Sequence, residues 1–206
     1  MEDTIQGILR VLQLAERLKF ELRHSWLSNG RQESVAEHTW QMGLMAVLMY
    51  RHLEHAVDVE HALKMILVHD LIEAEAGDVP FFETGARKAA KSEKERAAIE
   101  KIREMLDQTT GQEVYELWHA FETGETPEAK FAKALDNLEV QVQHNRADLG
   151  TWEEIEFDLV YAKMDKHCQH DAFLQAFCEA VKAEAEVKMR QGGIDVERVR
   201  RRASRL

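Results

Sequence analysis

The sequence predicts a single domain built almost entirely from α-helices. Apolar residues recur at spacings of three and four along most of the chain, which is the period of an amphipathic helix. The 206 residues include only 2 prolines and 10 glycines, which are few turn-forming residues for a many-stranded β fold. Hydrophobic residues make up 45% of the chain and charged residues 32%, which is typical of a globular protein rather than a disordered one.

The first two predicted helices flank a polar stretch. The first has an apolar stripe at helical spacing: Ile5, Ile8, Leu9, Leu12, Ala15 and Leu18. Residues 21–33 are polar and less periodic, with Asn29-Gly30 as a turn signal. Ser34 and Glu37 then form a capping box, which predicts a helix reaching about residue 53. The apolar residues of this second helix include Trp40, Leu44, Val47 and Leu48.

The next predicted helix is apolar on nearly every side. Asp58 can cap its beginning, and the sequence from Gly77 to Pro80 ends it. Its apolar residues are Ala62, Leu63, Met65, Ile66, Leu67, Val68, Leu71 and Ile72. We therefore expect this helix at the buried centre of the fold.

After a charged segment, residues 83–95, the pattern predicts a further series of helices. Ser92 and Glu95 are expected to open the first of them. The others are expected at about residues 111–122, 127–147, 151–163 and 169–190. Thr126-Pro127 supplies a cap and a first-turn proline, and Thr151 to Glu154 reads as another capping box. No linker divides residues 1–190, which we interpret as one domain.

Residues 191–206 form an arginine-rich end to the chain. Five arginines lie at positions 198, 200, 201, 202 and 205. The simplest expectation is a frayed basic tail, and the alternative is a specific contact with an acidic partner or a lipid.

Charge and hydropathy exclude several classes of protein. Asp and Glu number 38 and Lys and Arg 27, so the net charge of −11 disfavours nucleic-acid binding. No apolar run approaches the roughly 20 residues that cross a bilayer, and the first residues do not resemble a secretory signal. Cys168 and Cys178 lack metal-type spacing, which favours reduced core thiols in a cytoplasmic protein over a disulfide.

The chemistry is concentrated in the helix predicted to be buried. It carries His69, Asp70 and Glu73 among its apolar residues. Burying an unpaired carboxylate costs several kcal/mol, so a partner must compensate it. A divalent metal ion would do so, and a His-Asp hydrogen bond without metal is the alternative. Outside this helix, His38 and Asp136 also face the expected core, each on a separate helix. Buried polar residues on three separate helices are harder to explain by three unrelated neighbours than a single such residue would be.

These residues form the pattern H…HD…D, which resembles the HD-domain phosphohydrolases. The segments that carry the resemblance are Glu33-Ser-Val-Ala-Glu-His38, His69-Asp-Leu-Ile-Glu73, Gly77-Asp78-Val-Pro80 and Lys133-Ala-Leu-Asp136. The sequence is similar to the 5′-deoxynucleotidase subgroup over about residues 5 to 190, which implies an all-α HD-domain helical bundle. No Gly-Tyr-Pro follows the His-Asp pair, so the chain does not resemble the cyclic-di-GMP phosphodiesterase branch.

The resemblance implies roles for ten residues. The metal ligands would be His38, His69, Asp70 and Asp136. Their mixture of imidazole and carboxylate suits Mn²⁺ or Co²⁺ best, with Fe²⁺, Ni²⁺ or Zn²⁺ as alternatives, and suits Mg²⁺ less. Glu73 would be the catalytic acid or base, and Asp78 would help to hold substrate or water at the mouth of the site. The substrate residues would be Arg23, Trp26, Arg31 and Lys133, with a core anchor as the alternative for Trp26.

We therefore expect a phosphomonoesterase that removes the 5′-phosphate of (deoxy)nucleoside monophosphates by attack of a metal-activated water. The alternatives are hydrolysis of a nucleoside polyphosphate or pyrophosphate bond, and a non-catalytic metal or nucleotide sensor. A homodimer is expected from the family's habit and from the apolar residues Phe81, Phe82, Phe173 and Phe177. Phe81 and Phe82 could also cover the substrate pocket. No nucleic acid or membrane is expected as a partner.

Overall fold

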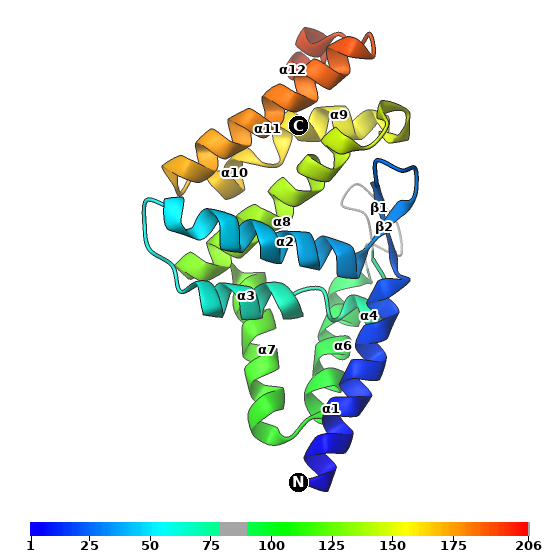
Figure 1. Ribbon diagram of the computed structural model, residues 1–206, viewed down its shortest axis with the longest axis vertical. Coiled ribbons are helices and arrows are strands. Elements are labelled where there is room, and N and C mark those ends of the chain that lie inside the picture. Colours follow the sequence, from blue (N-terminus) through cyan, green and yellow to red (C-terminus); the bar gives the residue numbers. More distant parts are fainter. Residues whose placement is uncertain (79–89, 206) are drawn as a thin grey trace.

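The computed structural model describes residues 1–78 and 90–205. Helices make up nearly all of its secondary structure, so the prediction of an all-α fold is confirmed (Figure 1). In chain order the elements are α1 (Glu2–Ala15), η1 (Glu16–Lys19), β1 (Leu22–Trp26), β2 (Gln32–Ser34), α2 (Val35–Met49), η2 (Tyr50–His52), α3 (Val59–Val68), α4 (Glu73–Ala76), α6 (Lys91–Met105), α7 (Gln108–Thr123), α8 (Pro127–Arg146), η3 (Leu149–Thr151), α9 (Glu154–Ala162), α10 (Asp165–Cys168), α11 (Ala172–Gln191) and α12 (Val196–Ala203).

Three helices, α2, α3 and α8, pack against one another at the centre of the molecule. Their buried side chains form the main core together with residues of α7 and α11; among them are Met42, Ile66, Phe131, Leu135 and Leu138. Figure 1 shows α1, α6 and α7 extending from one side of this centre and α9 to α12 from the other. The candidate site is built where the central helices meet.

Three predicted helix starts are confirmed. Ser34 and Glu37 form a reciprocal capping box at the beginning of α2. The Asp58 side chain accepts a hydrogen bond from a first-turn amide of α3, and Thr126 does the same for α8, with Pro127 as the first helical residue. These caps fix where the helices that carry the site begin.

The helix predicted between Asp58 and Gly77 is broken in two. α3 ends at Val68, a turn follows, and the four-residue α4 ends at Gly77, whose φ of 76° lies in the region that favours glycine. The expectation of an all-round buried helix is wrong in part, because Leu67 is 67% exposed. The turn allows the adjacent residues 69 and 70 to face the same point.

The polar stretch before α2 forms a hairpin that the sequence pattern did not predict. β1 and β2 pair antiparallel, and they enclose the predicted Asn29-Gly30 turn, where φ of Gly30 is 82°. It is the one sheet among the described residues. The hairpin matters because β1 carries Arg23 towards the central helices.

Two predicted helix starts differ in the structure. α6 begins at Lys91 after Ala90, without a side-chain cap from Ser92. α9 begins at Glu154, and its capping box joins Glu153 and Glu156 rather than starting at Thr151.

The end of the chain is a packed helix, so the expectation of a frayed tail is wrong. Val196, Val199 and Ala203 of α12 are buried. The opposite face is tied down by ion pairs, since Arg200 pairs with Glu186 and Arg202 lies 2.6 Å from an Asp158 carboxylate oxygen. An amphipathic helix with paired arginines is ordered because its apolar face covers α9 and α11.

Several apolar side chains of α1 and α2 face outward rather than into the core. On α2 these are Trp40, Leu44, Val47 and Leu48, which are 43% to 66% exposed. On α1 they are Ile5, Ile8, Leu9 and Leu12. Phe173 and Phe177 instead pack against the main core, so they are not the exposed surface that was predicted. Phe81 and Phe82 lie outside the described residues.

Two further expectations concern the thiols and the membrane. Cys168 and Cys178 are buried and free, as predicted. Among the described helices, none has the length and apolarity that a bilayer span requires.

Candidate functional site

The four predicted metal ligands come together from three parts of the chain. His38 lies in α2, His69 and Asp70 lie in the turn after α3, and Asp136 lies in α8. His69 Nε2 is 3.1 Å from Asp70 Oδ2, and His38 Nε2 is 3.3 Å from Asp136 Oδ1 and 3.9 Å from Asp70 Oδ2. Ligand atoms of His38, His69 and Asp136 all lie within 4.8 Å of one another. One ion could therefore bind His38, His69 and Asp136 together, and Asp70 lies beside the two imidazoles.

The chemistry of this cluster fits a metal ion. The Nε2 atoms of His38 and His69 are buried and make no hydrogen bond within residues 1–78 and 90–205. A buried polar atom without a partner costs free energy, so such atoms are rare unless a ligand satisfies them. Two imidazole nitrogens and two carboxylates form a donor set typical of divalent transition metals.

The second nitrogen of each imidazole is held by a hydrogen bond. His69 Nδ1 donates to the backbone carbonyl of Ile66 at 2.7 Å. His38 Nδ1 donates a hydrogen bond to Glu139 Oε2. With the protons on Nδ1, both Nε2 lone pairs point to the same place, which is the tautomer that a metal ligand needs.

The electrostatics of the cluster also favour a cation. Burial would raise the pKa of Asp70, but His69, His38 and Arg23 lower it to about 2. Burial likewise opposes ionisation of Asp136, and the nearby imidazoles outweigh it and lower its pKa. Both carboxylates are thus anionic at neutral pH, and a divalent ion would balance their charge.

Glu73 and Asp78 follow the His69-Asp70 pair in the sequence, and both lie beside the cluster. Glu73 is 6% exposed, and its Oε2 has no hydrogen-bond partner among the described residues. Its pKa is raised well above the ordinary range by burial and by the charges of Asp70 and Asp78. The pKa of Asp78 is raised as well, chiefly by burial. A carboxyl group with a raised pKa can hold or release a proton near neutral pH.

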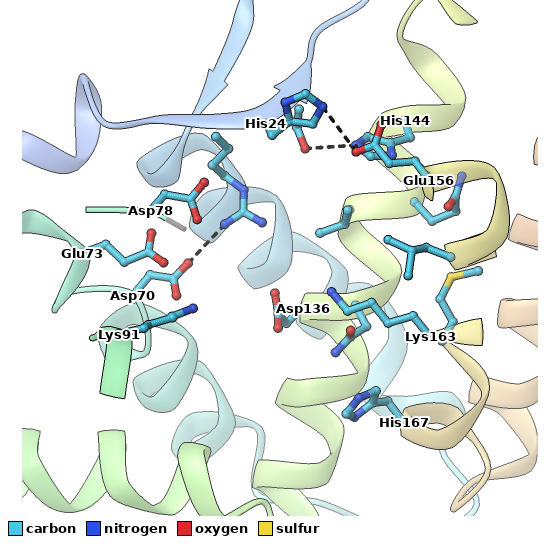
Figure 2. Close-up of a pocket in the computed structure, with 17 residues that line it drawn as sticks. His24, Asp70, Glu73, Asp78, Lys91, Asp136, His144, Glu156, Lys163 and His167 are labelled. Atoms are coloured by element: carbon cyan, nitrogen blue, oxygen red, sulfur yellow. Dashed lines mark hydrogen bonds and ion pairs between the residues drawn. The ribbon is translucent and has the colours of Figure 1, made fainter. Parts of the chain in front are cut away.

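A cavity of about 310 Å³ opens over the cluster, large enough for a small-molecule substrate (Figure 2). Asp70, Glu73, Asp78 and Lys91 line one side, and Lys163 and His167 lie across from them. His24, His144 and Glu156 gather at a third corner. The remaining lining residues are Arg23, Ser25, Asp136, Asn137, Val140, Gln141, Leu159 and Met164.

Of the four predicted substrate residues, only Arg23 lines this cavity. Its Nη1 atom is 3.5 Å from Asp70 Oδ2, and its Nε atom is 3.6 Å from Glu33 Oε2. These two carboxylates orient the guanidinium at the edge of the cluster. A guanidinium fork in this position can bind a phosphate through two parallel hydrogen bonds.

The other three candidates lie elsewhere. Arg31 is bound by Glu37, with an Nη2 to Oε1 distance of 2.6 Å, because the two side chains meet beside the capping box. Lys133 lies over the ring of Phe121, 5.0 Å from its centre. Trp26 is half-buried, and its carbonyl accepts a hydrogen bond from Gln143 at 2.7 Å. The structure does not bring these side chains to the cavity.

Comparison with known proteins decides the family. The model of the HD domain family matches residues 15–187. The chain belongs to the HD domain family. Among curated HD domain proteins, it is 35% identical to "5'-deoxynucleotidase HDDC2" of Danio rerio, covering 68% of each chain. It is 32% identical to "5'-deoxynucleotidase hdd1" of Schizosaccharomyces pombe, covering 66% of this chain and 70% of that one.

A solved structure has the same fold over nearly the whole chain. It is a predicted metal-dependent phosphohydrolase from Magnetospirillum magnetotacticum, with a TM-score of 0.78 and 28% identity. The match covers 94% of this chain and 96% of the other.

Several residues of this HD domain site were missed by sequence reasoning. Glu139 could have been predicted from the sequence, since it lies three residues after Asp136 and therefore on the same side of α8. Lys91, Lys163 and Glu156 had no such signal, because only the tertiary arrangement of distant segments brings them to the cavity. Their sequence surroundings are ordinary charged helix faces.

Proposed function

We propose that this protein is a metal-dependent phosphomonoesterase that hydrolyses the 5′-phosphate of (deoxy)nucleoside monophosphates. The observation that carries the proposal is the cluster of two carboxylates and two imidazole nitrogens, the latter without a hydrogen bond among the described residues. Its carboxylates, Asp70 and Asp136, line a cavity that also holds Arg23 and Glu73. The similarity to proteins named 5′-deoxynucleotidases supports the substrate class. The products are a nucleoside and inorganic phosphate.

The metal is held by His38, His69, Asp70 and Asp136. Mn²⁺ or Co²⁺ suits this mixed donor set best, and Fe²⁺, Ni²⁺ and Zn²⁺ are alternatives. When bound, such an ion supplies a Lewis acid that polarises the phosphoryl oxygen and lowers the pKa of water.

Arg23 binds the phosphate. Its guanidinium is fixed between Glu33 and Asp70, so little side-chain entropy is lost when the substrate arrives. Lys91 adds a second positive charge on the same side of the cavity, because its pKa is raised by Glu95 and Glu73 despite partial burial.

Glu73 moves the proton. Its carboxyl group lines the cavity beside Asp70, and its Oε2 atom is buried without a hydrogen-bond partner among the described residues. The carboxylate takes the proton of that water as its oxygen attacks phosphorus. The phosphorus–oxygen bond to the sugar then breaks, and the carboxylic acid returns the proton to the leaving 5′ oxygen. The raised pKa of Glu73 suits both halves of this exchange.

The proposal is tested by phosphate release from nucleoside monophosphates. Metal-free protein is reloaded with Mn²⁺, Co²⁺, Mg²⁺ or Zn²⁺ and assayed against deoxy- and ribonucleotides, with Asp136→Asn as the inactive control. We expect inorganic phosphate with Mn²⁺ or Co²⁺. Release of pyrophosphate from a triphosphate would favour the polyphosphate alternative, and nucleotide binding without turnover would favour a sensor.

The outward apolar face of α2, defined by Trp40, Leu44, Val47 and Leu48, supports a homodimer. These residues follow helical spacing and form one stripe of exposed apolar surface. A two-fold symmetric dimer would bury this stripe against the same stripe of a second copy, and such dimers are the commonest closed oligomers. The two free, buried cysteines fit a reducing, cytoplasmic compartment.

A further inference from the structure

We propose that Glu139 is a positioning residue that fixes His38 as a metal ligand and strengthens its bond to the metal. The inference rests on the metal site of the proposed function and extends it to a residue that does not touch the cavity. Glu139 lies on α8, one turn beyond Asp136, and is absent from the cavity lining.

The contact between the two side chains is wholly buried. Glu139 and His38 are both 0% exposed, and Glu139 Oε2 accepts a hydrogen bond from His38 Nδ1. A carboxylate taken out of water is expensive, so a buried one needs a compensating partner. The other oxygen, Oε1, has no hydrogen-bond partner within the described residues. The imidazole is thus the principal partner of this carboxylate.

The bond determines which nitrogen of His38 is free. Since a carboxylate can only accept, the proton stays on Nδ1 and the lone pair on Nε2 faces Asp70 and Asp136. The negative charge of Glu139 also makes the ring a stronger electron donor.

His69 provides an internal comparison. Its Nδ1 donates to the neutral carbonyl of Ile66, so its tautomer is fixed without an added charge. The two imidazoles are therefore unequal, and His38 is the stronger ligand. Removing the charge of Glu139 should weaken metal binding while leaving the geometry of the other ligands unchanged.

A neighbouring carboxylate supplies a matched control. Glu33 is 1% exposed and has an oxygen within 4.8 Å of ligand atoms of both His38 and Glu139, but it makes no hydrogen bond with His38. Glu33→Gln removes a buried carboxylate from the same neighbourhood without touching the bond. Because Glu33 also pairs with Arg23, the control is compared by Co²⁺ affinity and not by turnover. It separates the effect of the hydrogen bond from that of nearby charge.

The test is Co²⁺ affinity of the full chain, measured by competition with a chromophoric chelator at pH 8. We expect Glu139→Gln to weaken Co²⁺ binding by about 10- to 100-fold, and Glu33→Gln to bind nearly as wild type does. Saturating Co²⁺ should restore much of the turnover of Glu139→Gln, with KM for substrate unchanged. Glu139→Asp, which keeps the charge but shortens the reach, should also bind Co²⁺ more weakly and serves if the Gln variant does not fold.

Equal Co²⁺ affinity in wild type and the Glu139 variants would overturn the inference and leave the proposed function intact. Equal weakening by Glu33→Gln would overturn it as well, since charge alone would then explain the effect. If wild-type protein binds no Co²⁺, the metal site itself fails and the inference with it.

Discussion

The stability of the protein should fall on mild acidification because of His144. This side chain is 7% exposed, and burial lowers its pKa from 6.5 to about 4. In the unfolded chain, His144 is therefore protonated below about pH 6.5. In the folded protein, the same imidazole stays neutral until the pH falls to about 4. The folded pKa is the lower one, so the stability is fully present above pH 6.5 and is lost as the pH falls.

The size of the loss follows from linkage. With pKa values of 6.5 unfolded and about 4 folded, lowering the pH from 7.5 to 5 costs about 2 kcal/mol of unfolding free energy through this one group. His144→Gln keeps a neutral polar side chain in the cavity wall and cannot titrate. The variant should therefore lose about 2 kcal/mol less than wild type over the same interval.

Urea unfolding followed by circular dichroism measures this difference. Both proteins are stripped of metal, so that proton release by metal ligands does not contribute. Other groups titrate in both proteins and cancel in the comparison. Parallel loss of stability in wild type and variant would show that His144 is not neutral in the folded protein, and would refute the reasoning.

Three further predictions concern the site and the surface. Glu73→Ala should keep its metal and lose roughly 10²-fold in turnover, which elemental analysis beside a phosphate assay checks; loss of the metal would make Glu73 a ligand instead. Arg23→Lys should lower kcat/KM by about tenfold because a point charge replaces a two-pronged donor, and unchanged kinetics would remove Arg23 from the phosphate site. Leu44→Glu combined with Leu48→Glu should convert the dimer to a monomer near 23.8 kDa by light scattering, whereas a wild-type protein of that mass would contradict the dimer.

The sequence predicted those features that depend on local signals. Ser34, Asp58 and Thr126 each cap a helix because their side chains reach amides only a few residues away. The four proposed metal ligands stood out because polar groups within apolar stripes are costly to bury without a partner. Their assignment as ligands came from the resemblance to the HD-domain phosphohydrolases. Their convergence could be expected without knowing any distance.

Features that depend on tertiary packing were missed or misplaced. The break after Val68 is hidden because the apolar pattern continues through Leu71 and Ile72. Arg31 looked like a phosphate ligand, but Glu37 lies within reach and pairs with it. Lys163 follows the last residue of α9, and no local pattern indicates that it reaches the cavity.

Outward and inward apolar stripes also look alike in a sequence. The exposed stripe of Trp40, Leu44 and Leu48 has helical spacing, and so has the buried stripe of Met42, Met45 and Met49 on the same helix. Only the position of α3 and α8 decides which of the two enters the core.

The most direct test of the central claim measures metal content and phosphate release together. Asp70 Oδ2 lies 3.1 Å from His69 Nε2 and 3.9 Å from His38 Nε2, the two imidazole nitrogens that make no hydrogen bond within the described residues. Asp70→Ala should therefore lose both the bound metal and the hydrolysis, while Glu73→Ala keeps the metal. Full metal content in Asp70→Ala, measured by elemental analysis of a folded sample, would contradict the assignment of the metal site.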